Sequence, residues 1–192
     1  EKIRSRSATV VVVGQGYVGL PLAVRATEVG FRVVGVEKDE RRLDALKAGK
    51  SFIEDISDGH LQRSISAGLT FLDDLSTVDL RPDVTVISVP TPLLDGVPDL
   101  SFIEAAAEEV GPSLTPGSCV ILESTTYPGT TEELLVPILE RTSGLKRTQF
   151  HVGYSPERID PGNTKFDLQS TPKVVSGINV DSLEIVDSFF KT

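Results

Sequence analysis

The sequence predicts a doubly wound α/β domain, with a mostly parallel sheet and helices on both faces. Valine-rich apolar runs recur along the chain, and each is followed by a segment with helical periodicity. A run that is apolar at every position is typical of a strand buried on both faces of a parallel sheet. Right-handed connections between such strands through helices would give the doubly wound arrangement.

The first half of the chain begins with a strand–helix–strand–helix pattern. Residues 8–13 form the first expected strand, and an apolar helix follows that ends at Gly30. Residues 31–36 form the second strand, after which Asp39 can cap a charged helix over 40–47. This order predicts a βαβ unit.

The later elements continue the alternation. Further strands are expected at 69–72, 84–89, 118–122, 150–152 and 173–176. Further helices are expected at 59–67, at 101–110 with a cap at Asp99 or Ser101, and from after the capping residues Thr130 and Thr131 to about 141. A last helix is expected from Asp181 or Ser182 to the end. The last helix keeps its apolar periodicity to the final residues, so we expect it to pack on something outside this chain.

Composition excludes several classes of function. The 192 residues carry a net charge of −9, which argues against a general nucleic-acid or anionic-membrane surface. The single cysteine cannot form an internal disulfide, and no signal peptide or apolar run of about 18 residues is present. His60 and His151 lack metal-ligand spacing. We expect a soluble, cytoplasmic protein without a metal or a membrane segment.

A glycine-rich motif lies between the first strand and the first helix. It reads Gly14-Gln15-Gly16-Tyr17-Val18-Gly19, which is G-x-G-x-x-G. Gly14 would permit the tight turn, Gly16 would let a pyrophosphate approach the backbone, and Gly19 would let helix and strand pack closely. The helix N-terminus would offer unpaired N–H groups to the phosphates. We therefore assign Gly14, Gly16, Tyr17, Val18 and Gly19 to cofactor binding.

An acidic residue follows the second strand. Glu37 can accept hydrogen bonds from adenosine ribose hydroxyls and would repel a 2′-phosphate, which favours NAD over NADP. The neighbouring cations Lys38, Arg41 and Arg42 leave NADP open, although a solvated helix face is the favoured interpretation for them.

Three loops follow later predicted strands, where ligands of open α/β sheets bind. They are Val89-Pro90-Thr91-Pro92-Leu93, the hydroxyl-rich stretch from Glu123 to Thr131, and the stretch from Ser155 to Asn163 that holds Glu157 and Asp160. Each has a plainer interpretation taken alone: a rigid proline turn, helix capping, and a solvated charged turn.

Taken together, these loops and the glycine motif resemble the nucleotide-sugar 6-dehydrogenases of the UDP-glucose/GDP-mannose dehydrogenase family. The stretches GQGYVGLPLA, VPTPL, ESTTYPGTTEE and SPERIDPGN are most similar to the branch acting on UDP-N-acetylhexosamines. The resemblance implies a Rossmann-type fold and an NAD-linked, two-step oxidation of a sugar C6 alcohol to a carboxylate through a cysteine thioester.

The resemblance also implies roles for individual residues. Thr91, Ser124 and Thr125 would lie near the cofactor, and Thr125 would help to hold the catalytic water. Glu157 would act as acid or base in thioester hydrolysis, because a carboxylate beside bound water can accept its proton. Asp160 is a weaker match to a second acidic position.

The part of the family pattern that contains the nucleophilic cysteine has no match in this sequence. Cys119 lies on a predicted strand and is expected to be a buried small hydrophobe, not a nucleophile. We therefore interpret residues 1–180 as the NAD-binding domain of a UDP-sugar dehydrogenase and residues 181–192 as the start of a connecting helix, in an enzyme that forms a homodimer or higher oligomer. The alternatives are a hydroxyacid or hydroxyacyl dehydrogenase domain and a non-catalytic NAD-binding module.

Overall fold

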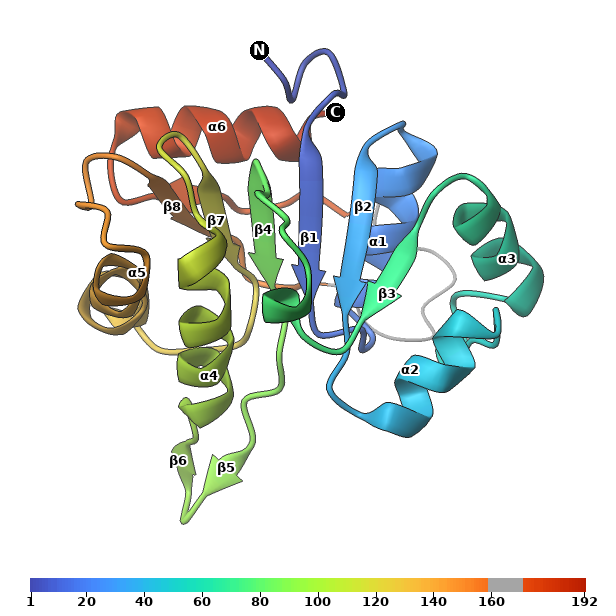
Figure 1. Cartoon of the computed structure of the whole chain (residues 1–192). Helices are drawn as coiled ribbons and strands as arrows, with labels where there is room; N and C mark the ends of the chain where they lie inside the picture. Colours follow the sequence, from blue (N-terminus) through green and yellow to red (C-terminus); the bar gives the residue numbers. More distant parts are fainter. Residues whose placement is uncertain (159–170) are drawn as a thin grey trace.

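The computed structural model describes residues 1–158 and 171–192. Its central feature is a seven-stranded sheet in the order β3-β2-β1-β4-β7-β8-β9 (Figure 1). The strands are β1 (Thr9–Val13), β2 (Arg32–Val36), β3 (Thr70–Leu72), β4 (Val84–Ile87), β7 (Cys119–Leu122), β8 (His151–Tyr154) and β9 (Ser176–Gly177). All neighbouring pairs are parallel except β8 and β9, so the predicted mostly parallel sheet is confirmed.

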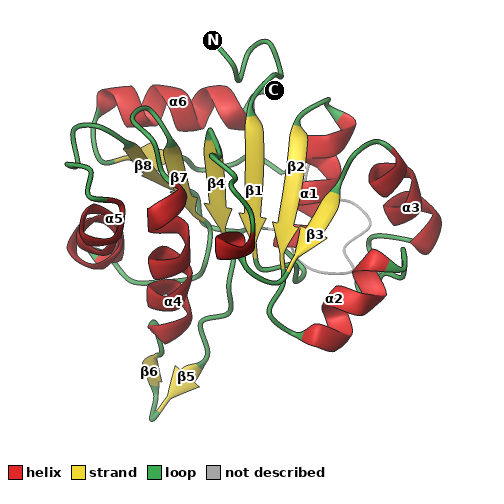
Figure 2. Ribbon diagram, viewed as in Figure 1, coloured by secondary structure: helices red, strands yellow, loops and turns green. Residues whose placement is uncertain are grey.

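Helices cover both faces of this sheet (Figure 2). They are α1 (Gly19–Glu28), α2 (Glu40–Lys47), α3 (Asp58–Ser66), α4 (Ser101–Val110), α5 (Val136–Ser143) and α6 (Val180–Phe190). Along β1, Val10 and Val12 belong to the core shared with α1 and α6, whereas Val11 and Val13 belong to the core shared with α4 and α5. Successive side chains of a strand point to opposite faces, so an all-valine strand buries both. The doubly wound arrangement is confirmed.

The first predicted helix boundaries agree with the structure. The side chain of Asp39 accepts hydrogen bonds from the backbone N–H groups of Arg41 and Arg42 and so caps α2. Gly30, with φ of +102°, follows the end of α1 in the left-handed conformation that glycine adopts without strain.

Two later helix starts differ from the prediction. Ser101 is the first helical residue of α4 and is not its cap; its N–H donates to Asp99. The helix after the hydroxyl-rich loop opens with a π-helical segment, Thr130–Leu135, preceded by Gly129 at φ +99°. Because the left-handed Gly129 makes the turn, Thr130 lies inside the helix and its hydroxyl donates to the Tyr127 carbonyl. The predicted capping by Thr130 and Thr131 is therefore wrong.

The last helix packs largely within this domain. Its cap is Asn179, which accepts the N–H of Ser182, so Asp181 and Ser182 are helical residues. Val186 and Phe189 are buried, and the Phe189 ring lies 5.8 Å from that of Phe31. The expectation that this apolar face packs outside the chain is wrong for these two residues. The assignment of 181–192 to a connecting helix stays a prediction.

A short antiparallel hairpin interrupts the proline-rich loop after β4. It consists of β5 (Leu93–Leu94) and β6 (Val97–Pro98) and extends beyond the sheet (Figure 1). The sequence prediction treated this segment as irregular.

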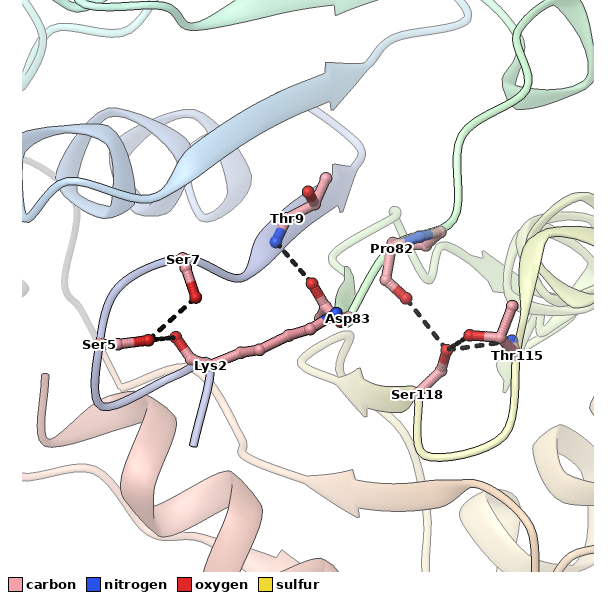
Figure 3. A network of polar contacts seen from close by, with 8 residues as sticks. All are labelled: Lys2, Ser5, Ser7, Thr9, Pro82, Asp83, Thr115 and Ser118. Atoms are coloured by element: carbon pink, nitrogen blue, oxygen red, sulfur yellow. Dashed lines mark hydrogen bonds and ion pairs between the residues drawn. The ribbon is translucent and has the colours of Figure 1, made fainter.

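The amino ends of the central strands are joined by polar contacts (Figure 3). Asp83, just before β4, accepts hydrogen bonds from the Lys2 ammonium at 2.6 Å and from the Thr9 N–H at 2.9 Å. Ser118, before β7, donates to the Pro82 carbonyl at 3.0 Å. These contacts fix the starts of β1, β4 and β7 against one another. No helix among residues 1–158 and 171–192 is long and apolar enough to cross a membrane.

Candidate functional site

The strand order reverses between β1 and β4. From β1 the chain builds outward through β2 and β3, and it then returns to the other side of β1 to form β4, β7 and β8. Such a switch point separates the loops that follow the two strands and leaves a crevice at the carboxyl edge of the sheet. Gly14 follows β1 and Ser88 follows β4, so the crevice begins between them.

The glycine motif forms this crevice in the way its spacing predicts. Gly14 has φ of +88°, and a Cβ there would lie 2.7 Å from the Ser88 carbonyl oxygen. A Cβ on Gly19 would overlap the carbonyl oxygen of Gly14, so only glycine allows α1 to start so close to β1. A Cβ on Gly16 would meet no atom of the chain within 4 Å. Gly16 therefore leaves open space at this point of the loop.

Ser88 fixes the glycine motif against the neighbouring strand. Its hydroxyl lies 3.1 Å from the carbonyl oxygen of Val13 and 3.0 Å from that of Gly14, as donor to both. The sequence prediction did not single out Ser88, because a lone serine after a strand has no distinctive signal.

Glu37 is buried against the glycine motif. Its carboxylate accepts the N–H of Gln15 at 3.3 Å and the N–H of Asp39 at 3.0 Å, and the residue is only 8% exposed. Gln15 is fully buried and donates from Nε2 to the Val12 carbonyl at 2.8 Å. Glu37 thus connects the loop after β1 to the loop after β2.

The cations near Glu37 are engaged by other groups. The Lys38 ammonium lies 2.8 Å from Glu109 and 3.5 Å from Asp74. The Arg42 guanidinium lies over the Phe52 ring, 5.3 Å from its centroid. Lys38, Arg41 and Arg42 are all exposed, as expected for a solvated helix face, but Lys38 and Arg42 also make these contacts.

Ser124 connects the two loops on the other side of the switch point. Its buried hydroxyl donates to the Val89 carbonyl at 2.8 Å, which fixes the loop after β7 against the loop after β4. The Thr91 hydroxyl is buried and has no hydrogen-bond partner among the described residues. Together Thr91, Ser124 and Thr125 line this part of the crevice.

Two carboxylates that line the crevice, Glu123 and Glu157, share one lysine. The Lys173 ammonium lies 2.5 Å from Oε1 of Glu123 and 3.1 Å from Oε2 of Glu157. The Glu123 side chain is 1% exposed, and its Oε2 has no hydrogen-bond partner in the described part of the chain. Burial raises the pKa of the Glu123 carboxyl, and the attraction of Lys173 opposes that rise.

These parts form one continuous cleft of about 600 Å³, a volume typical of small-molecule sites. It brings together Gly14, Gly16, Tyr17, Val18, Glu37, Thr91, Ser124, Thr125 and Glu157, all of which the sequence assigns to the site. Gly19 lies behind the motif and does not line the cleft. Asp160 lies outside the described residues. Phe102, Glu123 and Lys38 also line the cleft and were not assigned to it from the sequence.

Cys119 takes no part in the cleft. It is 1% exposed within β7, and burial raises the pKa of its thiol to about 12. The prediction that it is a buried hydrophobe is confirmed. No group of three or more potential metal ligands occurs among the described residues. His60 instead lies 2.6 Å from Glu28, on the outside of the domain.

The fold and the cleft define a Rossmann-type dinucleotide-binding domain. The model of the UDP-glucose/GDP-mannose dehydrogenase family, NAD binding domain, matches residues 8–192. The chain therefore belongs to this family, and NAD is its cofactor. The resemblance inferred from the four motifs is confirmed.

Individual relatives agree with the family. The UDP-N-acetyl-D-glucosamine 6-dehydrogenase of Pseudomonas aeruginosa is 41% identical over 95% of this chain. A UDP-D-ManNAc dehydrogenase structure from Pyrococcus horikoshii superposes with a TM-score of 0.89 at 31% identity, over 95% of this chain. The GDP-mannose dehydrogenase structure from Pseudomonas aeruginosa gives a TM-score of 0.85 at 28% identity, also over 95%. The chain spans 43% of the first relative and 44% of each structure.

Proposed function

We propose that this chain is the cofactor-binding part of an NAD-dependent nucleotide-sugar 6-dehydrogenase. The complete enzyme would oxidise the C6 alcohol of a UDP-sugar, preferably a UDP-N-acetylhexosamine, to the uronate. The observation that carries this proposal is the single cleft that joins the glycine motif, Glu37, the loop of Ser124 and Thr125, and Glu157 across the switch point. The names of the relatives favour the same substrate class.

The order of the strands suggests how a dinucleotide would lie. Glu37 follows β2 and would accept hydrogen bonds from the adenosine ribose, while the open loop at Gly16 would receive the pyrophosphate. The other end of the ligand would then reach Thr91, Ser124 and Thr125, beyond β4 and β7. The bound nicotinamide would supply the hydride acceptor at this end.

Glu157 is the proposed acid or base. It follows β8 at the far end of the cleft, where its carboxylate is paired with Lys173. A carboxylate there can accept a proton from a water molecule that attacks an acyl group, and Thr125 would help to orient that water. Asp160 stays a prediction for a second acidic group.

The thioester chemistry needs a nucleophile that this cleft does not contain. Cys119 is the single cysteine of the chain, and it is buried in the sheet. We therefore expect the 192-residue chain to bind NAD(H) without oxidising a UDP-sugar. For the complete enzyme we propose a homodimer or higher oligomer in the cytoplasm.

Two assays on the purified 192-residue chain test this proposal. Isothermal titration with NADH should give saturable binding. Absorbance of NADH should not increase when NAD⁺ is supplied with UDP-N-acetylglucosamine or UDP-N-acetylmannosamine, under conditions where the Pseudomonas aeruginosa relative is active. Oxidation of a UDP-sugar by the isolated chain would contradict the proposal that this chain binds the cofactor but lacks the nucleophile. A non-catalytic NAD-binding module would also pass both assays, and a reading frame that continues into a cysteine-containing domain would exclude it.

A further inference from the structure

Lys38 occupies a position that bears on the choice between NAD and NADP. It directly follows Glu37 and lines the same cleft. In dinucleotide-binding domains, a carboxylate after the second strand suits the ribose 2′-hydroxyl of NAD, whereas a cation nearby accommodates the 2′-phosphate of NADP. The sequence places both kinds of group here, side by side.

The Lys38 ammonium is held by two carboxylates from other parts of the fold. It lies 2.8 Å from Oε2 of Glu109, on α4, and 3.5 Å from Oδ2 of Asp74, before the short helix at Leu75–Thr77. The Glu109 side chain is only 11% exposed, and its second oxygen accepts the N–H of Leu75 at 2.9 Å. Asp74 in turn accepts the N–H of Ser76 at 2.7 Å. Backbone hydrogen bonds thus fix both carboxylates before they meet Lys38.

Electrostatic interactions favour the charged form of Lys38 between the two carboxylates. Burial alone would lower the pKa of Lys38, but its hydrogen bonds and attraction to Glu109 and Asp74 outweigh the burial, so the pKa is raised. A phosphate that approached Lys38 would have to displace these two carboxylates or lie close to them. Glu109 and Asp74 therefore oppose phosphate binding in two ways: they engage the Lys38 ammonium, and their negative charges repel the phosphate.

We propose that Glu109, assisted by Asp74, is a specificity-determining residue for NAD: by holding Lys38 in an ion pair, it withholds this cation from the 2′-phosphate of NADP. The inference rests on the cleft being the cofactor site of the proposed function. Discrimination between NAD and NADP would thus depend in part on a residue of α4 that is distant in sequence from Glu37. Arg42 also lines the cleft, but its guanidinium lies over the Phe52 ring.

A double-mutant cycle tests the proposal on the 192-residue chain. Dissociation constants for NADPH and NADH are measured by cofactor fluorescence at low salt for wild type, E109Q, K38M and E109Q/K38M. A glutamine at position 109 can still accept the Leu75 N–H but carries no charge. We expect E109Q to bind NADPH about five- to tenfold more tightly, with NADH affinity changed by less than about twofold. The double variant should lose this gain, and K38M alone should change NADPH binding little.

The neighbouring Glu108 provides a matched control. It lies on the same helix, pairs with Arg141 at 2.9 Å, and does not line the cleft, so E108Q should leave the NADPH-to-NADH ratio unchanged. If E109Q unfolds, D74N should shift the ratio in the same direction by a smaller factor. An unchanged NADPH-to-NADH affinity ratio in E109Q overturns the proposal, and so does a gain in NADPH affinity that persists in E109Q/K38M. Normal NADH binding by these variants would show that the cofactor site itself is intact. Absence of NADH binding in wild type would instead refute the proposed function.

Discussion

Lys173 and Glu123 form a buried ion pair at the far end of the cleft, with 2.5 Å between Nζ and Oε1. The same ammonium reaches Glu157 at 3.1 Å and lies 5.1 Å from the centre of the Phe190 ring. One lysine thus joins the end of β7, the end of β8 and the last helix. Glu157, the proposed acid or base, is one of the two carboxylates that this lysine contacts.

Removal of the lysine should destabilise the domain. K173M leaves the Glu123 carboxyl buried without its partner, and breaking a buried pair in this way costs about 3 kcal/mol. Urea denaturation at neutral pH measures the loss. K191M removes the exposed pair of Lys191 with Asp187 and should cost less than about 1 kcal/mol. If K173M and K191M lose the same free energy of unfolding, the inference that Lys173 compensates a buried charge is wrong.

Glu123 should also make stability depend on pH. Burial raises the pKa of Glu123 in the folded state above its usual 4.5, although Lys173 opposes the rise. The folded state then binds more protons than the unfolded state between 4.5 and the folded pKa, so stability falls as pH rises through that window. E123Q removes the titrating group, so the difference in unfolding free energy between wild type and E123Q should change across the window. If this difference in unfolding free energy does not change with pH, the pKa of Glu123 is not raised in the folded state.

Two glycines of the motif should respond differently to alanine. G19A places a Cβ against the Gly14 carbonyl oxygen and should lower the unfolding free energy by about 1–3 kcal/mol. G16A places its Cβ in open space, so the melting temperature should hardly change, whereas NADH binding should weaken at least about tenfold. Calorimetry and cofactor titration on both variants check this. If G16A binds NADH as wild type does, the pyrophosphate does not approach the loop there.

Much of this architecture could be predicted because its signals are local. The all-valine strand, Asp39 before α2 and the glycine spacing each act over a few residues, and each was found where the sequence placed it. The four motifs lie after parallel strands, so the topology alone brings them to one edge of the sheet.

The contacts that join the motifs could not be predicted. Glu123 and Lys173 are 50 residues apart, and Lys38 meets Glu109 where α4 packs beside the short helix at Leu75–Thr77. No periodicity or spacing relates such pairs. The predicted threonine caps failed for a different reason, since the left-handed Gly129 turns the chain before the threonines and leaves them inside the helix.

Glu37 should contribute strongly to cofactor affinity. E37A removes the carboxylate proposed to accept the ribose hydroxyls, and hydrogen bonds to charged groups contribute about 1.5–3 kcal/mol each. We expect NADH binding to weaken at least about tenfold in calorimetric titration. E40A, which changes an exposed glutamate in the first turn of α2, is the matched control and should bind normally. Unchanged binding by E37A would count against the ribose contact.

The thiol of Cys119 should be unreactive in the folded chain. Because burial raises its pKa to about 12, thiolate is scarce at pH 8, and Ellman's reagent should react only after denaturation. C119A should keep NADH affinity. Rapid labelling of the native chain at pH 8 would mean that the sheet opens at β7.

We propose that one cleft across the switch point binds NAD. Titration of the ¹⁵N-labelled 192-residue chain with NAD⁺, followed by amide chemical shifts, maps the contact surface directly. We expect the largest shifts at residues 14–19, at Glu37 and Lys38, and at Thr91, Ser124 and Thr125. Saturable shifts that gather elsewhere and leave the glycine motif unmoved would contradict it.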